Sequence, residues 1–307
     1  MSKIIQFMHP GRQKNLEEWN EFDELCDEHS AKFMVSPGSY VDKHHQSTAQ
    51  KGKLYFWGEY EPQSKIIENY KKAPYGYPIS LHQPCYPDLS KYTKHFHTTD
   101  PFVFGNCFKY IWCMQETFKD LRTLELGDLI LFGSRRKKND KEYIFGLDTV
   151  FVIGTRQPYT MNCSFDFSKV KYDDCYNKAT IIPLSDTVRQ LTFYQGATFE
   201  DQFENMFSFV PSRKENEPFA KFPIGNEEAD EINRHIVSAS LKNKNGENVV
   251  INPKKSVGIS CICTTQNSVK KVWSAIRDKV LNDKYVLGVQ FDTPTPRQKI
   301  TGGMKGQ

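Results

Sequence analysis

The fold is decided by two apolar runs, Leu124-Glu-Leu-Gly-Asp-Leu-Ile-Leu-Phe-Gly-Ser134 and Tyr143-Ile-Phe-Gly-Leu-Asp-Thr-Val-Phe-Val-Ile153, with the charged segment 135–142 between them. Both runs are rich in aliphatic and aromatic residues, which at this length favour strands. Two such runs joined by a short polar connection are typical of an antiparallel β-hairpin. The sequence therefore predicts a sheet in the middle of the chain.

The rest of the chain mixes helical and strand patterns. A strand rich in aromatic residues runs from Lys53 to Glu61 and stops at Pro62. Residues 71–101 form a long irregular stretch, and the pattern of 102–114 fits a buried strand or a short helix equally well. Helical spacing predicts helices over 16–29, 199–209, 227–241 and 267–281. Strands are expected at 180–184, 257–263 and 285–291, so the last helix would belong to a βαβ unit.

Composition and charge argue against several classes of protein. The 307 residues carry a net charge of +4, which is too mild to indicate nucleic-acid binding by itself. No apolar run approaches the roughly 18 residues of a membrane helix, and the first residues do not resemble a signal peptide, so we expect a cytoplasmic protein with no membrane partner. The eight cysteines are then expected to be reduced thiols. The chain lacks the P-loop, dinucleotide-binding and zinc-protease motifs, and we expect no cofactor.

One face of the strand 53–61 combines an indole with carboxylates. Tyr55, Trp57, Glu59 and Glu61 share this face because side chains alternate along a strand. Indole rings stack on nucleobases, and a neighbouring carboxylate can accept a hydrogen bond from an exocyclic amine or polarise a water molecule. The alternative is an edge strand with a solvated acidic face and a structural tryptophan.

Two further carboxylates stand out by their position. Asp100 precedes Pro101 at the end of a long polar stretch, where a catalytic carboxylate or a simple Asx turn would each fit. Asp148 lies inside an otherwise apolar strand, so an inward side chain must be hydrogen-bonded or functional. An outward side chain would be an ordinary surface residue.

Cations gather in the connection between the two apolar runs. Arg135, Arg136, Lys137 and Lys138 lie at the expected hairpin tip. Charge runs are usually solvated tips, but contact with phosphates becomes credible if an aromatic pocket opens beside them. Tyr75 and Tyr77, flanked by prolines, form either a stacking loop or a rigid turn.

Histidine and cysteine side chains in the irregular stretch suggest a zinc site. His82, Cys85, His95 and His97 supply ligand types that suit zinc, but the chain lacks the usual paired cysteines. Histidines also arise easily in polar loops. We therefore expect a hydrogen-bonded loop here and no metal.

The residues Gly127-Asp-Leu-Ile-Leu-Phe-Gly-Ser134 and the strand 145–153 resemble the central strands of PUA-like barrels, the superfamily of PUA, ASCH, EVE and YTH domains. The strand that carries Trp57 is similar to the aromatic element lining their base pocket. Residues 1–155 also resemble nucleotide-modification-associated domains of phage and anti-phage loci, although the ASCH signature G-x-K-x-x-E-x-R is missing. The resemblance covers about half the chain and implies a pocket for a flipped or modified base.

These patterns predict an α+β protein: a PUA-like β-barrel for base recognition over 1–158, an α/β accessory region over 159–292 that covers it, and a flexible tail over 293–307. We expect it to bind nucleic acid, modified duplex DNA ahead of RNA, with one base extruded. If the protein is an enzyme, it would hydrolyse the N-glycosidic bond of that base, as an antiviral DNA glycosylase would. The alternatives are a non-catalytic module that binds a peptide or small ligand in an aromatic groove, and an enzyme of free nucleotides. The expected site residues are Asp100, Asp148, Glu59 and Glu61 for catalysis, Trp57, Tyr75, Tyr77, Phe102 and Phe104 for the base, and Arg135, Arg136, Lys137 and Lys138 for phosphates.

Overall fold

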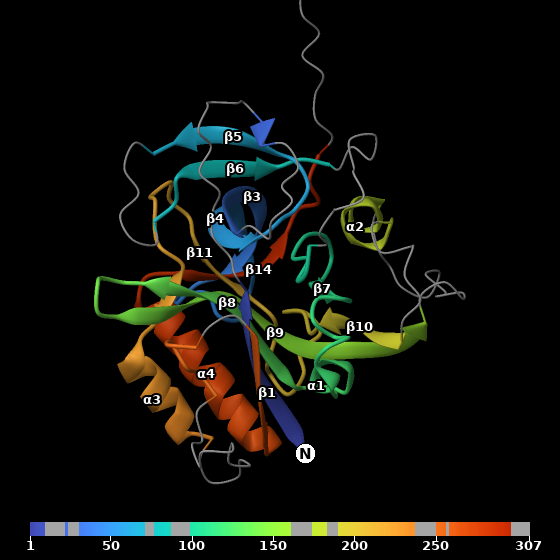
Figure 1. Ribbon diagram of the computed structural model, residues 1–307. Helices are drawn as coiled ribbons and strands as arrows, with labels where there is room; N and C mark the ends of the chain where they lie inside the picture. Colours follow the sequence, from blue (N-terminus) through green and yellow to red (C-terminus); the bar gives the residue numbers. More distant parts are fainter. Residues whose placement is uncertain are drawn as a thin grey trace, which may run out of the picture.

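The described part of the chain forms two β-sheets and five helical segments (Figure 1). The computed structural model describes residues 1–9, 22–23, 31–70, 77–86, 99–160, 174–182, 190–236, 250–255 and 258–295. The strands are β1 (Ser2–His9), β2 (Phe22–Asp23), β3 (Ala31–Val41), β4 (Gln50–Glu59), β5 (Ser64–Asn69), β6 (Ser80–Pro84), β7 (Lys109–Tyr110), β8 (Leu129–Lys137), β9 (Tyr143–Thr160), β10 (Gln190–Gly196), β11 (Val210–Arg213), β12 (Phe222–Ile224), β13 (Gly258–Thr264) and β14 (Val286–Phe291). The helices are α1 (Lys119–Arg122), α2 (Asp174–Tyr176), η3 (Asn177–Ile181), α3 (Asn226–Arg234) and α4 (Gln266–Asn282).

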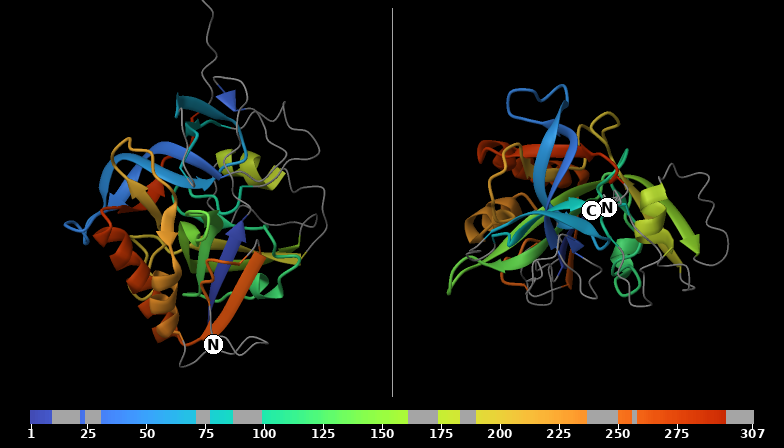
Figure 2. Two further views of the ribbon diagram at one scale, coloured as in Figure 1. Left: turned by 60° about the vertical axis from the view of Figure 1, so that its left-hand side comes forward. Right: turned by 90° about the horizontal axis from the view of Figure 1, so that it is seen from above.

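The first sheet is open and contains the expected hairpin. Its strands follow the order β13-β1-β8-β9-β10-β7, and β12 pairs with β9. β8 and β9 are antiparallel over residues 129–137 and 143–152, which confirms the hairpin. β1 runs parallel to β8, and β13 runs antiparallel to β1. The left view of Figure 2 shows β1 between β13 and β8, so the first and last parts of the chain meet in this sheet.

The second sheet contains a small closed barrel. β3 pairs with β4, β4 with β11, β11 with β14, and β14 again with β3, so these four strands close a ring. β6, β5 and β2 extend the sheet beyond β3. The α+β class is therefore confirmed, and a small β-barrel is present. The β8–β9 hairpin lies in the open sheet instead of the ring, and both sheets combine strands from either side of residue 158.

The open sheet is buried on both faces, which explains its long apolar runs. Leu129 and Leu131 point into one apolar cluster, whereas Ile130 and Phe132 point into another. Neighbouring residues of a strand face opposite sides, so each side of this sheet carries its own core. Fourteen of the thirty buried residues of the second cluster are phenylalanine or tyrosine, which accounts for much of these two residue types in the chain.

Helices α3 and α4 cover the first of these clusters, and they lie side by side in Figures 1 and 2. The predicted helix over 267–281 is confirmed as α4, and that over 227–241 is confirmed in part as the shorter α3. Thr265 caps α4, since its Oγ1 accepts a hydrogen bond from the Ser268 backbone N–H at 3.2 Å. The βαβ prediction is wrong, because β13 belongs to the open sheet and β14 to the barrel. The helix connects two different sheets.

Three other element predictions differ from the structure. The predicted helix at 199–209 is a turn in which Phe203 and Met206 form a bridge, with positive φ at Glu204 and Asn205. Phe207 there packs its ring 5.1 Å from that of Trp273, so tertiary packing overrode the helical spacing. The predicted strand at 180–184 is helical where it is described, in η3. The predicted helix at 16–29 lies outside the described residues except for β2.

Candidate functional site

Trp57 lies on β4 and belongs to the first apolar cluster, the one that α3 and α4 cover. Its side chain is only 2% exposed, and its Nε1–H donates to the carbonyl oxygen of Phe219 at 2.7 Å. The ring of Phe33 lies 5.7 Å away, tilted against it. In this conformation the indole therefore has no open face on which a base could stack.

Arg136 lies on that indole. The guanidinium carbon of this β8 residue is 4.5 Å from the centroid of the Trp57 ring, and the side chain is half-buried. A guanidinium is planar and favours the face of an aromatic ring through cation–π attraction. The structure thus brings together one predicted base-stacking residue and one predicted phosphate-binding residue.

An ion pair between Lys221 and Asp148 lies beside the indole. Lys221 Nζ contacts Asp148 Oδ2 and is 5.8 Å from the centroid of the Trp57 ring. The Lys221 side chain has no exposed surface, and that of Asp148 is 9% exposed. Asp148 therefore points inward, the case in which a charged strand residue must be paired or functional.

A β-bulge and a glycine produce this pairing. Phe132 pairs with Thr149 and Gly133 with Leu147, so Asp148 is the extra residue of the bulge. Bulges redirect side chains and are frequent next to active sites. On the other side, a Cβ atom at Gly146 would lie 2.9 Å from Lys221 Cβ, so only glycine leaves room for the lysine stem.

His9 and Glu59 form a second buried pair. His9 Nδ1 lies 3.4 Å from Glu59 Oε2, and their side chains are 8% and 9% exposed. Glu59 also acts electrostatically on Lys221. We call the six residues Trp57, Arg136, Asp148, Lys221, His9 and Glu59 the Trp57 cluster.

The pKa values in the Trp57 cluster are shifted. Burial lowers the pKa of Lys221 to about 8; the charge of Asp148 opposes this shift, and Arg136 adds to it. Burial likewise raises the pKa of Asp148, against the effects of Lys221 and Arg136. Shifted pKa values in a group of buried ionisable side chains are a recognised mark of a functional site, because proton transfer needs donors and acceptors of similar affinity.

The other two predicted catalytic carboxylates, Asp100 and Glu61, are buried, and both act electrostatically on the Cys113 thiol, as Glu59 does. Asp100 is fully buried and accepts hydrogen bonds from the backbone N–H groups of Ile111, Trp112 and Cys113 at 3.1, 2.6 and 2.8 Å. Asp100 therefore holds the backbone of residues 111–113 in place, which is a structural contact with a later segment and differs from the local Asx turn of the alternative. Glu61 is also buried, and its backbone N–H donates to Thr99 Oγ1 at 3.0 Å.

Two of the predicted base-binding rings belong to the aromatic core. Phe102 and Phe104 are fully buried, with ring centroids 5.5 Å apart. Phe104 also packs edge-on against Tyr60 at 5.4 Å. Tyr77 is 44% exposed, and Tyr75 lies outside the described residues. Among the predicted base-binding rings that the structure describes, Tyr77 is the only exposed one.

The remaining predicted cations lie at the exposed hairpin tip. The Arg135 guanidinium stacks on Tyr143 at 3.7 Å. Lys137 and Lys138 are 42% and 58% exposed and pair with Asp140 at 2.9 Å and Glu142 at 3.3 Å. Arg135 precedes Arg136 in the chain, and Lys137 and Lys138 follow it, so the hairpin tip that adjoins the Trp57 cluster carries cations together with the carboxylates of Asp140 and Glu142.

The suggested zinc ligands are divided between described and undescribed residues. His82 Nδ1 lies 2.9 Å from Ser64 Oγ, and the Cys85 thiol donates to the Gln83 carbonyl oxygen. His95 and His97 lie outside the described residues. In the part of the chain that the structure describes, no three His, Cys, Asp or Glu side chains are placed to hold a metal ion.

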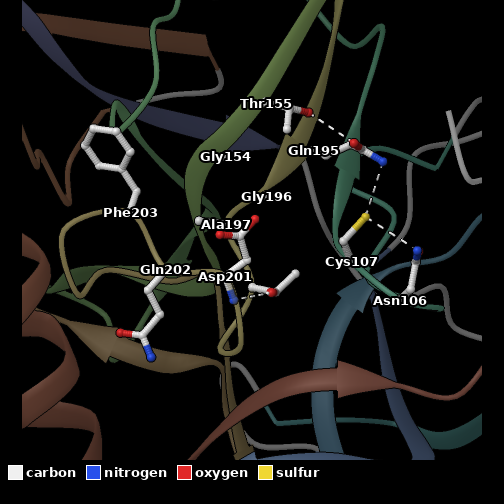
Figure 3. A pocket seen from close by; sticks show the side chains of 11 residues that line it. Asn106, Cys107, Gly154, Thr155, Gln195, Gly196, Ala197, Asp201, Gln202 and Phe203 are labelled. Atoms are coloured by element: carbon white, nitrogen blue, oxygen red, sulfur yellow. Dashed lines mark hydrogen bonds between the residues drawn. The ribbon is translucent and has the colours of Figure 1, made fainter. Parts of the chain in front are cut away.

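Sequence reasoning missed a pocket that is lined by the paired strands β9 and β10 and by the segments 106–107 and 197–203 (Figure 3). It has a volume of about 420 Å³, and its lining residues are Asn106, Cys107, Gly154, Thr155, Gln195, Gly196, Ala197, Thr198, Asp201, Gln202 and Phe203. At Gly154, a Cβ atom would lie 2.6 Å from the backbone nitrogen of Ala197. At Gly196, a Cβ atom would lie 2.5 Å from Ser208 Oγ. Both glycines therefore permit close contacts, and they were the signal available in the sequence.

Hydrogen bonds order one wall of this pocket. Thr155 Oγ1 donates to Gln195 Oε1 at 3.1 Å, and Gln195 Nε2 donates to Cys107 Sγ at 3.6 Å. Figure 3 shows this chain on one side, the Phe203 ring on the other, and Asp201 between them. Amide groups, a carboxylate and a ring suit a small polar ligand.

Comparison of the chain with known protein families, with curated protein sequences and with solved structures gives no match in any of the three. None of the helices in the described residues has the length and apolar character needed to cross a membrane.

Proposed function

We propose that this protein binds nucleic acid and accommodates one extruded base at the Trp57 cluster. The contact between Arg136 and Trp57 carries this proposal: a planar cation lies over the indole, in the place that a stacked base would take. The small β-barrel is compatible with the PUA-like resemblance, which implies a base pocket. Entry of a base would displace the Arg136 side chain toward the phosphates.

The energy balance of this exchange requires phosphate contacts. Extrusion of a base costs a few kcal/mol, and stacking on an aromatic ring returns about 1–3 kcal/mol. Removing the guanidinium from the indole forfeits about 0.5–2 kcal/mol. Stacking alone therefore does not drive binding. Lys137 and Lys138 are exposed and supply the electrostatic attraction that would.

If the protein is catalytic, Asp148 and Glu59 are the carboxylates that the geometry favours. Both belong to the Trp57 cluster, whereas Asp100 is occupied by three backbone N–H groups. A carboxylate beside the sugar would activate water or stabilise the oxocarbenium-like transition state of N-glycosidic cleavage, by analogy with glycosidases.

A salt titration with duplex DNA tests the binding. Duplexes with and without a modified base are titrated between 50 and 200 mM salt, and base release is followed as alkali-labile strand breaks. We expect affinity to fall steeply with salt, and the Lys137→Ala/Lys138→Ala variant to reduce the slope by about 2. Lys270→Ala/Lys271→Ala, on α4, is the matched control and should leave the slope unchanged. A slope near zero for the wild-type protein would contradict the proposal.

A second candidate function is a small-ligand binding module at the Gln195 pocket. The observation in its favour is the ordered polar wall facing Asp201 and Phe203. Affinity for an uncharged ligand such as adenosine or cytidine should depend weakly on salt and should fall in the Asp201→Asn variant. Binding of these nucleosides that is unchanged in Asp201→Asn would exclude this pocket as their site.

A further inference from the structure

The Trp57 cluster contains an amine that the proposed function does not use. Lys221 is fully buried and is held between Asp148 and the indole. Replacing a buried ion pair by apolar side chains is often neutral or stabilising, because removing two charges from water offsets their attraction. Stability alone is therefore a weak reason for a lysine at this position, and its chemistry is the stronger one.

The surroundings of Lys221 favour the neutral amine. It is desolvated, and a second cation, Arg136, lies on the same indole. Lysine amines that are desolvated or placed next to another cation are the ones that attack carbonyl groups. The other charged groups near it are Asp148 and Glu59, with His9 paired to Glu59.

Asp148 has the two oxygens that such an attack requires. Oδ2 contacts Lys221 Nζ and can take its proton. Oδ1 is buried and accepts no hydrogen bond from any residue that the structure describes. A buried acceptor without a donor costs about 1–3 kcal/mol. A hydroxyl group formed next to Lys221 Nζ would supply that donor.

We propose that Lys221 is an amine nucleophile that forms an imine with an aldehyde, with Asp148 as its proton acceptor. The identity of the aldehyde rests on the proposed function: after loss of a base, the sugar it leaves has an aldehyde at C1′. The Lys221 ammonium first gives one proton to Asp148. The neutral amine then bonds to the carbonyl carbon as the C=O double bond becomes single, and one of its two protons moves to the carbonyl oxygen, so that one proton stays on the nitrogen. Asp148 then protonates the resulting hydroxyl group, water leaves, and a protonated imine forms. Neither step needs an oxidant or a reductant.

Access to Lys221 depends on Arg136. Lys221 has no exposed surface, so a neighbouring side chain must move before a carbonyl group reaches it. Arg136 contacts the same indole, is half-buried and precedes the exposed Lys137 at the end of β8. The smallest opening is therefore a movement of the Arg136 side chain, and we expect Arg136→Ala to speed imine formation.

Reductive trapping tests the proposal. The whole chain is incubated at pH 7.5 with glycolaldehyde and, separately, with a duplex that contains an abasic site, in the presence of cyanoborohydride. Adducts are then mapped by peptide mass spectrometry. A lysine with a pKa near 8 has roughly 200-fold more neutral amine at this pH than an ordinary lysine. We therefore expect Lys221 to be modified roughly tenfold or more faster than Lys214, whose side chain is 48% exposed and pairs with Asp42.

Two variants sharpen the test. Lys221→Arg keeps the charge but cannot form the imine, so trapping at this position should vanish; Lys214→Arg is the matched control and should leave it unchanged. If Lys221→Arg does not fold, the peptide map of the wild-type protein still decides. Asp148→Asn should slow trapping at Lys221 by roughly tenfold or more, because the amide cannot accept the lysine proton.

The outcomes separate this inference from the proposed function. Base release from DNA without any adduct at Lys221 would overturn the inference and leave the proposed function standing. A glycolaldehyde adduct at Lys221 in a protein that neither binds DNA nor releases a base would support the inference and contradict the proposed function. Adducts confined to other lysines or to the amino terminus overturn the inference.

Discussion

Lys221 and Asp148 are 73 residues apart in the sequence and form an ion pair in which neither side chain is more than 9% exposed. Phe222 of β12 pairs with Leu147 of β9, so the antiparallel register brings the preceding lysine beside the bulged aspartate. Trp57 and Arg136 from two further strands complete the arrangement. Three distant parts of the chain, namely β4, the β8–β9 hairpin and the residue before β12, thus place opposite charges around one indole.

Removal of the Lys221 amine should lower the stability of the protein, because it leaves the buried Asp148 carboxylate without its counter-ion. We expect Lys221→Met to lower the free energy of unfolding by about 3–5 kcal/mol. The double variant Lys221→Met/Asp148→Asn should recover part of this loss. Urea denaturation measures both, and Lys214→Met, which removes an exposed lysine paired with Asp42, should cost about 0–1 kcal/mol. A Lys221→Met loss no larger than that of Lys214→Met would show that the pair is solvated in solution.

Removal of the Arg136 guanidinium should expose the Trp57 indole to solvent. We expect Arg136→Ala to increase acrylamide quenching of Trp57 fluorescence and to cost about 0.5–2 kcal/mol of stability. The chain has four tryptophans, so the signal is taken as the difference from the same variant carrying Trp57→Phe. Arg135→Ala is the matched control, since that guanidinium stacks on Tyr143. Equal quenching in the two arginine variants would contradict the assignment of Arg136 as the cover of the indole.

Asp100 should make stability depend on pH. Burial raises the pKa of Asp100 to about 7, against three backbone N–H donors that lower it. The folded protein then binds more protons than the unfolded chain between the ordinary value of 3.8 and about 7. Its contribution is fully present below pH 3.8 and is lost as the pH rises through 7.

Asp100→Asn should flatten this dependence and cost about 1–3 kcal/mol, because the amide cannot accept from all three N–H groups. Denaturation at pH 4, 5.5 and 7 measures both effects. The exposed Asp120, which pairs with Lys3 at 3.0 Å, is the control. Asp120→Asn should change neither the free energy of unfolding nor its dependence on pH appreciably. DNA binding by Asp100→Asn at the wild-type level supports a structural role, and its loss in a folded variant would return Asp100 to the candidate site.

Gly146 should be intolerant of a methyl group. A Cβ atom there would meet Lys221 Cβ at 2.9 Å and Cδ at 3.2 Å. We expect Gly146→Ala to cost about 1–3 kcal/mol and to slow aldehyde trapping at Lys221, since the lysine stem must shift. Gly52→Ala is the control, because its Cβ would meet only the movable ring edge of Tyr40 at 3.1 Å. Trapping at the wild-type rate in Gly146→Ala would contradict the proposed position of the amine.

Local patterns predicted the elements whose backbone hydrogen bonds form within one segment or with the next strand in the chain. The β8–β9 hairpin and helix α4 follow from alternation and from helical spacing, and both are present. The turn at Phe203–Met206 has the same helical spacing, but the packing of Phe207 on Trp273 decided its conformation. Short apolar segments carry too little local free energy to resist such contacts.

The sequence by itself determined which side chains are unusual: an indole beside carboxylates on β4, an aspartate in an apolar strand, and a run of cations at a hairpin tip. Only the tertiary structure decided that Asp148, Trp57 and Arg136 meet while Asp100 holds the backbone of residues 111–113. It alone revealed Lys221, which no local pattern marks. The reason is physical: the pairing of charges depends on strand register, bulges and burial, which are properties of contacts between distant segments.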